Sequence, residues 1–205
     1  LKNSKDLPLF GINDSVFLQY SDCPGLITKK EVRVQLLAEL NLPKQGIIWD
    51  IGSGVGSIGL EALRISPNLQ LVSVDKRIGS KNIIEENARR LQVSPSLILE
   101  DEALNILKRN KILAHLSAPD RVIIGGGGSN LHLIIEEVFK KINNFCILII
   151  PLISLKTLSK LESILKPKVN KFSISQHQSY RGVNIGDDIR LSPLNPVYIL
   201  KCEIE

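Results

Sequence analysis

Short apolar runs alternate with amphipathic stretches along most of the chain. The apolar runs are rich in isoleucine, leucine and valine, which is typical of strands buried on both faces of a sheet. Strands are predicted at residues 46–51, 69–75, 97–100, 121–124, 146–150, 169–176 and 197–202. Helices are predicted at residues 57–65, 80–91, 102–109, from the glycines at 125–128 through 141, and at 155–165. The alternation predicts a mostly parallel sheet with helices on both faces.

Three other segments complete the expected organisation. Residues 1–25 contain several turn-forming residues and are predicted to be irregular, ahead of a single domain at 26–205. Thr28 and Glu31 match a capping box, with Thr28 as the N-cap of a further helix whose apolar face continues to Leu40. Residues 177–196 contain glycine and several charged residues and are predicted to be a polar connection.

Strand–helix units followed by a final pair of strands are typical of a doubly wound, Rossmann-like α/β fold. By analogy with class I methyltransferases, we expect a seven-stranded sheet whose last strand runs antiparallel. This expectation is an analogy at the level of the fold, because hydrophobic periodicity does not give strand direction.

The loop after the first predicted strand carries the strongest sign of a ligand. Gly52, Gly54 and Gly56 remove side chains where the backbone turns, and the helix that follows directs free N–H groups at the same place. A nicotinamide-binding loop needs a third glycine at the position of Ser57. Together with Asp50 at the end of the strand, the pattern favours S-adenosylmethionine, although a tight turn without a ligand remains the simpler alternative.

Acidic residues after the next two strands support a nucleoside. Asp75 ends the second strand, where a carboxylate can accept hydrogen bonds from both ribose hydroxyls. After the third strand, Asp101 and Glu102 are both candidates for the adenine side, and Glu102 followed by Ala103 matches the usual methyltransferase spacing better. The alternative for Asp75 is a helix cap or a polar strand end, and the alternative for Asp101 and Glu102 is an acidic first helical turn that interacts with the helix dipole.

Composition narrows the class without identifying a substrate. The chain has 205 residues, 23% of them charged, and a net charge of +5, which is compatible with an anionic ligand but does not require nucleic acid. The cysteines and histidines show no metal-ligand spacing, so no metal is expected and a cytoplasmic protein is the default. The longest apolar run is too short for a membrane span. Methionine is absent, which we interpret as a missing natural start or an excised domain.

The order of several motifs resembles one family specifically. These motifs are the segments at residues 11–14, 25–33, 48–52, 123–128 and 195–197, of which the second, the four glycines starting at Gly125 and the last are the more distinctive. Together they resemble the precorrin-6Y methyltransferase family of cobalamin biosynthesis, in particular its decarboxylating, carbon-15-methylating unit. The resemblance covers nearly the whole chain.

The resemblance implies methyl transfer from S-adenosyl-L-methionine to a tetrapyrrole ring carbon, with loss of carbon dioxide from a ring acetate. It also implies a homotetramer, and a unit that occurs alone or as the C-terminal half of a fusion with a second methyltransferase. Residues 1–25 would then lie on the substrate side. The full predicted cofactor-binding set is Thr28, Asp50, Gly52, Ser53, Gly54, Val55, Gly56, Asp75, Glu102, Ala103 and Gly125.

Residues that act on the substrate are not specified by any motif. Arg181, Arg190 and Lys156 are candidates for binding substrate carboxylates, and Tyr180 and His177 are candidates for moving protons. Solvated surface charges explain the three cations equally well. The alternative functions are an RNA methyltransferase, a non-catalytic module that binds S-adenosylmethionine, and, more distantly, a nicotinamide oxidoreductase.

Overall fold

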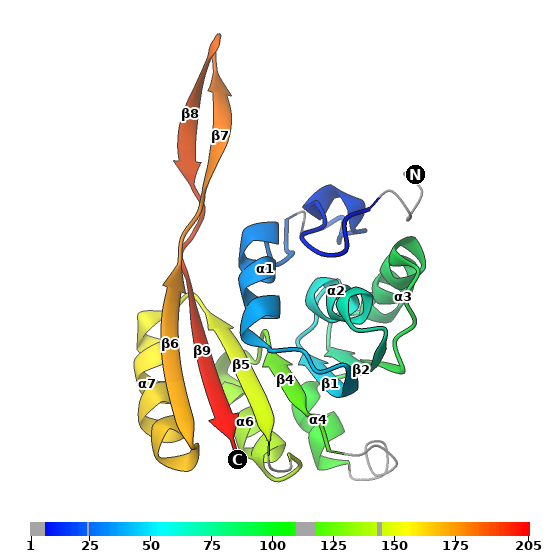
Figure 1. Ribbon diagram of the computed structural model, residues 1–205, viewed down its shortest axis with the longest axis vertical. Coiled ribbons are helices and arrows are strands. Elements are labelled where there is room, and N and C mark those ends of the chain that lie inside the picture. The colour runs from blue at the N-terminus through cyan, green and yellow to red at the C-terminus, as the bar shows by residue number, and fades with distance from the viewer. Residues whose placement is uncertain (1–6, 24, 110–117, 143–144) are drawn as a thin grey trace.

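The computed structural model describes residues 7–23, 25–109, 118–142 and 145–205. Residues 1–6 of the predicted N-terminal segment, with Pro24 and His115, lie outside the described residues. The first described elements are a short 3-10 helix, η2 (Asp14–Val16), and the helix α1 (Lys30–Glu39). Figure 1 shows a sheet covered by helices, with one long hairpin that extends away from it.

A seven-stranded sheet forms the centre of the molecule, in the order β3-β2-β1-β4-β5-β9-β6. Strands β1 to β5 pair in parallel, and β9 lies antiparallel between β5 and β6. The predicted α/β class and the antiparallel last strand are therefore confirmed. The strands are β1 (Gln45–Ile51), β2 (Asn68–Asp75), β3 (Leu97–Glu100), β4 (Arg121–Ile124), β5 (Cys146–Leu152), β6 (Lys171–His177) and β9 (Val197–Ile204).

Helices cover both faces of this sheet because successive strand residues point to opposite sides. In the described part of the chain, the helices after α1 are α2 (Ser57–Ile65), α3 (Ser80–Leu91), α4 (Ala103–Lys108), α6 (Leu131–Phe139) and α7 (Leu155–Leu165), with 3-10 turns η3 (Gly128–Asn130) and η4 (Lys166–Lys168). Trp49 and Ile51 of β1 pack in the apolar cluster beneath α4, α6 and α7, while Ile48 packs in the cluster beneath α1, α2 and α3. Among the described residues, no helix has the length and apolar character needed to cross a membrane.

The predicted polar connection before the last strand is wrong. It contains a two-stranded hairpin of β7 (Tyr180–Ile185) and β8 (Asp188–Pro193), which extends beyond the sheet (Figure 1). Gly186 adopts a φ of +61° in the turn, which is strained for other residues. The apolar residues of the hairpin alternate with polar ones at the period of a strand, and this pattern outweighs the polar composition.

The predicted capping box at the start of α1 is also wrong. Lys29 occupies the N-cap position, and no side chain caps the helix. The Glu31 carboxylate accepts hydrogen bonds from Arg181, with Oε2 at 2.6 Å from Nη2, so an ion pair with the hairpin replaces the local contact to Thr28. Thr28 lies before the helix and is available to the cavity described below.

Candidate active site

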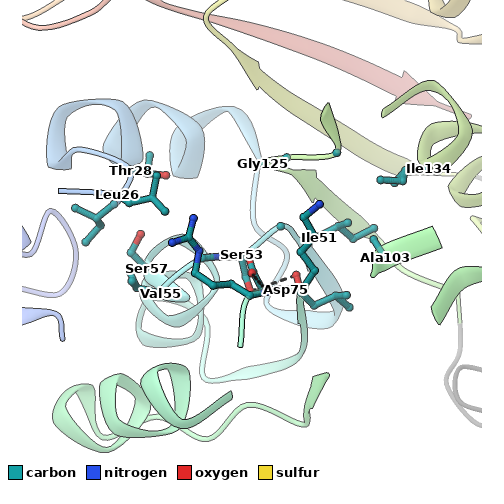
Figure 2. A pocket seen from close by; sticks show the side chains of 18 of the residues that line it. Leu26, Thr28, Ile51, Ser53, Val55, Ser57, Asp75, Ala103, Gly125 and Ile134 are labelled. Carbon is teal, nitrogen blue, oxygen red and sulfur yellow. Dashed lines mark hydrogen bonds between the residues drawn. The ribbon is translucent and has the colours of Figure 1, made fainter. Parts of the chain in front are cut away.

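The carboxyl ends of β1, β2 and β4 meet at one edge of the sheet, where the loops that follow them enclose a cavity of about 800 Å³. Figure 2 shows Leu26 and Thr28 on one side of this cavity, Ala103 and Ile134 on the other, and Asp75 between them. Parallel strands place their ligand sites at this edge, at the point where strand order reverses. Here that point lies between β1 and β4.

Most of the predicted cofactor-binding residues lie together in this cavity. Thr28 comes from the segment before α1, Asp75 from β2, and Glu102 and Ala103 from the turn into α4. The residues of the predicted set that line the cavity are Thr28, Gly52, Ser53, Gly54, Val55, Asp75, Glu102, Ala103 and Gly125. Asp101, the alternative to Glu102, does not line it and instead binds Asn105 and Arg109.

Two members of the predicted set do not line the cavity. Gly56 has a φ of +77° at the N-cap of α2, and a Cβ there would lie 3.1 Å from Ile84 of α3. Asp50 is 1% exposed beneath the loop, where its Oδ2 accepts a hydrogen bond from the Gly59 N–H at 3.1 Å. Its Oδ1 has no hydrogen-bond partner within the described part of the chain. Burial raises the pKa of Asp50 to about 7.

Backbone hydrogen bonds fix the glycine loop from the β2 side. The N–H groups of Gly52 and Ser53 donate to the Val74 carbonyl, and the Gly54 N–H donates to Asp75 Oδ2 at 2.7 Å. Asp75 Oδ1 also accepts from the Arg77 N–H at 2.9 Å. The Asp75 carboxylate therefore holds the glycine loop and also lines the cavity. Because these hydrogen bonds fix its orientation, a ligand hydroxyl could donate to a carboxylate that is already in place.

The second glycine run packs directly on the first. A Cβ on Gly52 would lie 2.9 Å from the Gly126 nitrogen, and a Cβ on Gly125 would lie 3.0 Å from the Gly52 carbonyl oxygen. The Gly125 N–H donates to the Ile51 carbonyl at 2.8 Å. Glycine is thus required where these two backbones touch. By contrast, a Cβ on Gly54 would meet nothing within 4 Å, so this glycine leaves cavity space that a side chain would fill.

Two further lining residues come from the C-terminal part of the sequence. Ile153 follows β5, and Asn195 lies between β8 and β9. The remaining lining residues that the cofactor motifs do not include are Gly25, Leu26, Ile27, Ile51, Ser57, Val74, Lys76, Arg77, Gly126, Gly127 and Ile134. Asn195 belongs to one of the distinctive motifs, so its sequence context was a usable signal, whereas nothing in the sequence singles out Ile153.

The charged candidates for substrate binding lie elsewhere. Arg181 donates to Glu31 and to Asp14 Oδ2 at 3.0 Å, and these ion pairs raise its pKa above the ordinary value. Two other candidates are exposed and do not line the cavity: Arg190 on the hairpin and Lys156 on α7.

The two candidates for proton transfer do not line the cavity either. His177 contacts Ser175 Oγ through Nε2 at 2.9 Å, and Tyr180 is exposed at the hairpin base. The cations at the cavity are Lys76, whose Nζ lies 2.9 Å from Glu102 Oε1, and Arg77.

A buried arginine holds the segment that carries Thr28. The side chain of Arg33 is fully buried, and its Nε donates to Glu61 Oε1 at 2.6 Å. Its remaining nitrogens donate to Asp14 and to the carbonyls of Ile12 and Thr28. A buried guanidinium is tolerated when it is paired and its donors are satisfied, as here.

Comparison with known proteins shows to which enzyme family the chain belongs. A family model described as a precorrin methyltransferase domain matches residues 20–203. The chain belongs to the precorrin methyltransferase family. This membership confirms the predicted family and the predicted class of enzyme, an S-adenosylmethionine-dependent C-methyltransferase.

Individual relatives agree with the family. A protein of Pyrobaculum aerophilum, named a probable cobalt-precorrin-6B C(15)-methyltransferase (decarboxylating), is 31% identical over 93% of this chain and 94% of its own length. A Sinorhizobium protein named precorrin-6Y C(5,15)-methyltransferase [decarboxylating] is 34% identical over 62% of this chain, but the match spans only 29% of that protein. The crystal structure of precorrin-6Y C5,15-methyltransferase from Geobacter metallireducens has a TM-score of 0.83 and 26% identity, covering 97% of this chain and 100% of the other.

Proposed function

We propose that this precorrin methyltransferase transfers the methyl group of S-adenosylmethionine to carbon 15 of a precorrin ring and releases carbon dioxide from a ring acetate. The family match and the names of the relatives support the substrate and the reaction. The observation that carries the cofactor assignment is the meeting of the glycine loop, Asp75 and Ala103 in one cavity. The open space at Gly54 and the oriented carboxylate of Asp75 fit a nucleoside with an extended amino-acid tail.

In this proposal, each wall of the cavity has a task. Asp75 accepts the ribose hydroxyls, and the turn of Glu102 and Ala103 borders the adenine. The N–H groups at the start of α2 and the segment at Thr28 face the carboxylate end of the cofactor. The lining residues Ile153 and Asn195, which have no part in holding the cofactor, are assigned to the tetrapyrrole. Gly25 also lines the cavity, which supports a place on the substrate side for the end of the predicted N-terminal segment.

The reaction needs positioning more than a nucleophilic residue. The cofactor supplies a methyl group already activated as a sulfonium, and the reduced ring supplies an electron-rich carbon. A carbon–sulfur bond breaks as the new carbon–carbon bond forms. When the acetate loses carbon dioxide, the electron pair of its broken carbon–carbon bond passes to the ring and a proton takes the place of the carboxyl group. The chain's contribution is to hold the two partners at attack distance and to exclude water, which lowers the barrier substantially.

We further propose a homotetramer assembled through the hairpin. A two-stranded hairpin is marginally stable by itself in water. The hairpin of β7 and β8 nevertheless exposes large apolar side chains, which are Tyr180, Val183, Ile185, Ile189 and Leu191. An assembly of copies would cover them.

The partial match to the longer Sinorhizobium protein also supports the proposal that this unit occurs in fusions with a second enzyme.

Ligand-dependent thermal unfolding tests the cofactor assignment. S-adenosylmethionine and S-adenosylhomocysteine, each at about 100-fold its dissociation constant, are expected to raise the free energy of unfolding by about 2.7 kcal/mol, and NAD is not. Asp75→Ala is expected to lose most of this gain, because it removes the ribose partner and the acceptor of the Gly54 N–H. A gain with NAD alone would favour an oxidoreductase. Tight, salt-dependent binding of RNA without binding of precorrin would favour an RNA methyltransferase.

A further inference from the structure

Helix α3 carries a polar side chain that is fully buried although it does not line the cavity. Asn87 has no exposed surface. Its Oδ1 accepts from the Leu18 N–H at 2.6 Å, and its Nδ2 donates to the Leu18 carbonyl at 3.0 Å and to the Val55 carbonyl at 2.9 Å. One amide therefore joins three elements that are far apart in the sequence: the N-terminal segment, the glycine loop and α3.

The Val55 carbonyl belongs to the loop that forms the cavity wall. Val55 lines the cavity, and its side chain packs in one apolar cluster with Phe17, Tyr20 and Leu91. One turn before Asn87, Ile84 packs against Gly56. Helix α3 thus contacts the glycine loop at two points. Ile84 makes an apolar contact with Gly56, and Asn87 makes a hydrogen bond to the Val55 carbonyl.

The geometry requires an amide at this position. Asn87 presents one acceptor and two donors to a buried N–H and two buried carbonyls, so each group is satisfied. A leucine of similar size would leave all three unpaired, which is costly in a buried site. An aspartate would keep the acceptor for Leu18 but place negative charge against both carbonyls. Since asparagine is a poor helix former, packing of α3 alone does not explain it.

We propose that Asn87 is a positioning residue for the glycine loop, which sets the cavity-facing backbone for the cofactor and couples it to the docked N-terminal segment. The inference rests on the proposed binding of S-adenosylmethionine at this loop. Asn87 touches neither cofactor nor substrate, so it acts through the Val55 carbonyl. Loss of its donors releases the loop while the sheet and the other cavity walls stay in place.

Two substitutions and one matched control separate positioning from general stability. Asn87→Leu removes all three hydrogen bonds, and Asn87→Asp removes the two donors. The control is Arg64→Gln. The Arg64 side chain also ties the N-terminal segment to the body of the protein, through the carbonyls of Leu7, Pro8 and Leu9, and it binds the Leu91 carbonyl of α3. It makes no hydrogen bond to the glycine loop.

The measurement is calorimetric binding of S-adenosylhomocysteine at a temperature where circular dichroism shows each variant to be folded. Both Asn87 variants are expected to bind about tenfold more weakly or worse, whereas Arg64→Gln stays within about twofold of the unsubstituted protein. Hydrogen exchange of the Gly54 and Gly56 amides is expected to quicken in the Asn87 variants alone. Asn87→Ser, which adds no charge, replaces either variant that does not fold.

The possible outcomes distinguish the two proposals. If the unsubstituted protein binds S-adenosylhomocysteine and folded Asn87 variants bind it equally well with unchanged loop exchange, the positioning role is wrong. An equal loss of affinity in Arg64→Gln would also overturn it, because the effect would then be general destabilisation. If the unsubstituted protein itself does not bind, the cofactor assignment fails, and the exchange of the loop amides still decides whether Asn87 positions the loop.

Discussion

Asp75 is the last residue of β2 and Asp50 the second-last residue of the neighbouring β1, but the two aspartates lie in different environments. Asp75 reaches the cavity and accepts hydrogen bonds from the loop, while Asp50 is sealed beneath the same loop with one oxygen unpaired. The close approach of Asp50 depends on Gly59, where a Cβ would lie 3.0 Å from Asp50 Oδ2. The sequence marked both aspartates as cofactor residues because each ends a strand. Burial depends on how α2 packs, and that is not visible in the local pattern.

The buried position of Asp50 predicts a distinctive dependence of stability on pH. Its pKa of about 7 in the folded protein lies above the usual 3.8, so the folded state keeps a proton that the unfolded state loses. The contribution of Asp50 to stability is therefore fully present below about pH 4 and is lost as the pH rises to about 7.

Asp50→Asn tests this dependence. The amide oxygen can still accept from the Gly59 N–H, but the side chain no longer ionises. Denaturant unfolding of both proteins between pH 4 and pH 8 is expected to show a stability difference that grows with pH in favour of the variant, by a total on the order of 2–4 kcal/mol. Other titrating groups cancel in this difference. A difference that does not change with pH would contradict the burial of an ionisable group at this position.

At the scale of elements, the core strands and helices were predictable and the hairpin was not. Each of the strands β1 to β5 carries an apolar run and is followed by a helix, so local pattern and packing agree. The hairpin of β7 and β8 buries little of its own surface, and its glycines and charges resemble a loop. It is tied to the rest of the molecule by Arg181, which binds Glu31 and Asp14 more than a hundred residues away in the sequence. These long-range ion pairs cannot be predicted from the local sequence, so the sequence signal for the hairpin is limited to the alternation of its apolar residues.

The exposed hairpin predicts how the assembly can be broken. Ile189 and Leu191 lie on one face of β8, and replacing both with threonine keeps strand propensity while removing apolar surface. Multi-angle light scattering is expected to show a tetramer for the unsubstituted protein and a smaller species for the double variant. Lys156→Ser, at an exposed position on α7 outside the hairpin, is the control and should leave the mass unchanged. An unsubstituted protein that is monomeric at high concentration would rule out this assembly.

At the scale of the whole molecule, the topology explains why the predicted cofactor residues meet. The strand order reverses between β1 and β4, and the loops after β1, β2 and β4 therefore converge at one edge. The residues that follow β1, β2 and β4 could be assigned to the carboxyl edge of the sheet from the sequence, because each comes directly after a predicted strand. The wall formed by Ile153 and Asn195 depends on where β5 and β9 lie, and the antiparallel insertion of β9 was expected only by analogy with a known fold.

The central claim is methyl transfer coupled to decarboxylation on a precorrin, and single-turnover product analysis tests it most directly. The protein is incubated with S-adenosylmethionine labelled in the methyl group and with a precorrin-6B-type substrate labelled in the ring acetate carboxyl. We expect one labelled methyl group in the tetrapyrrole for each labelled carbon dioxide released, and neither product with Asp75→Ala. Binding of S-adenosylhomocysteine without methyl incorporation, or methyl transfer without release of carbon dioxide, would contradict the proposed reaction.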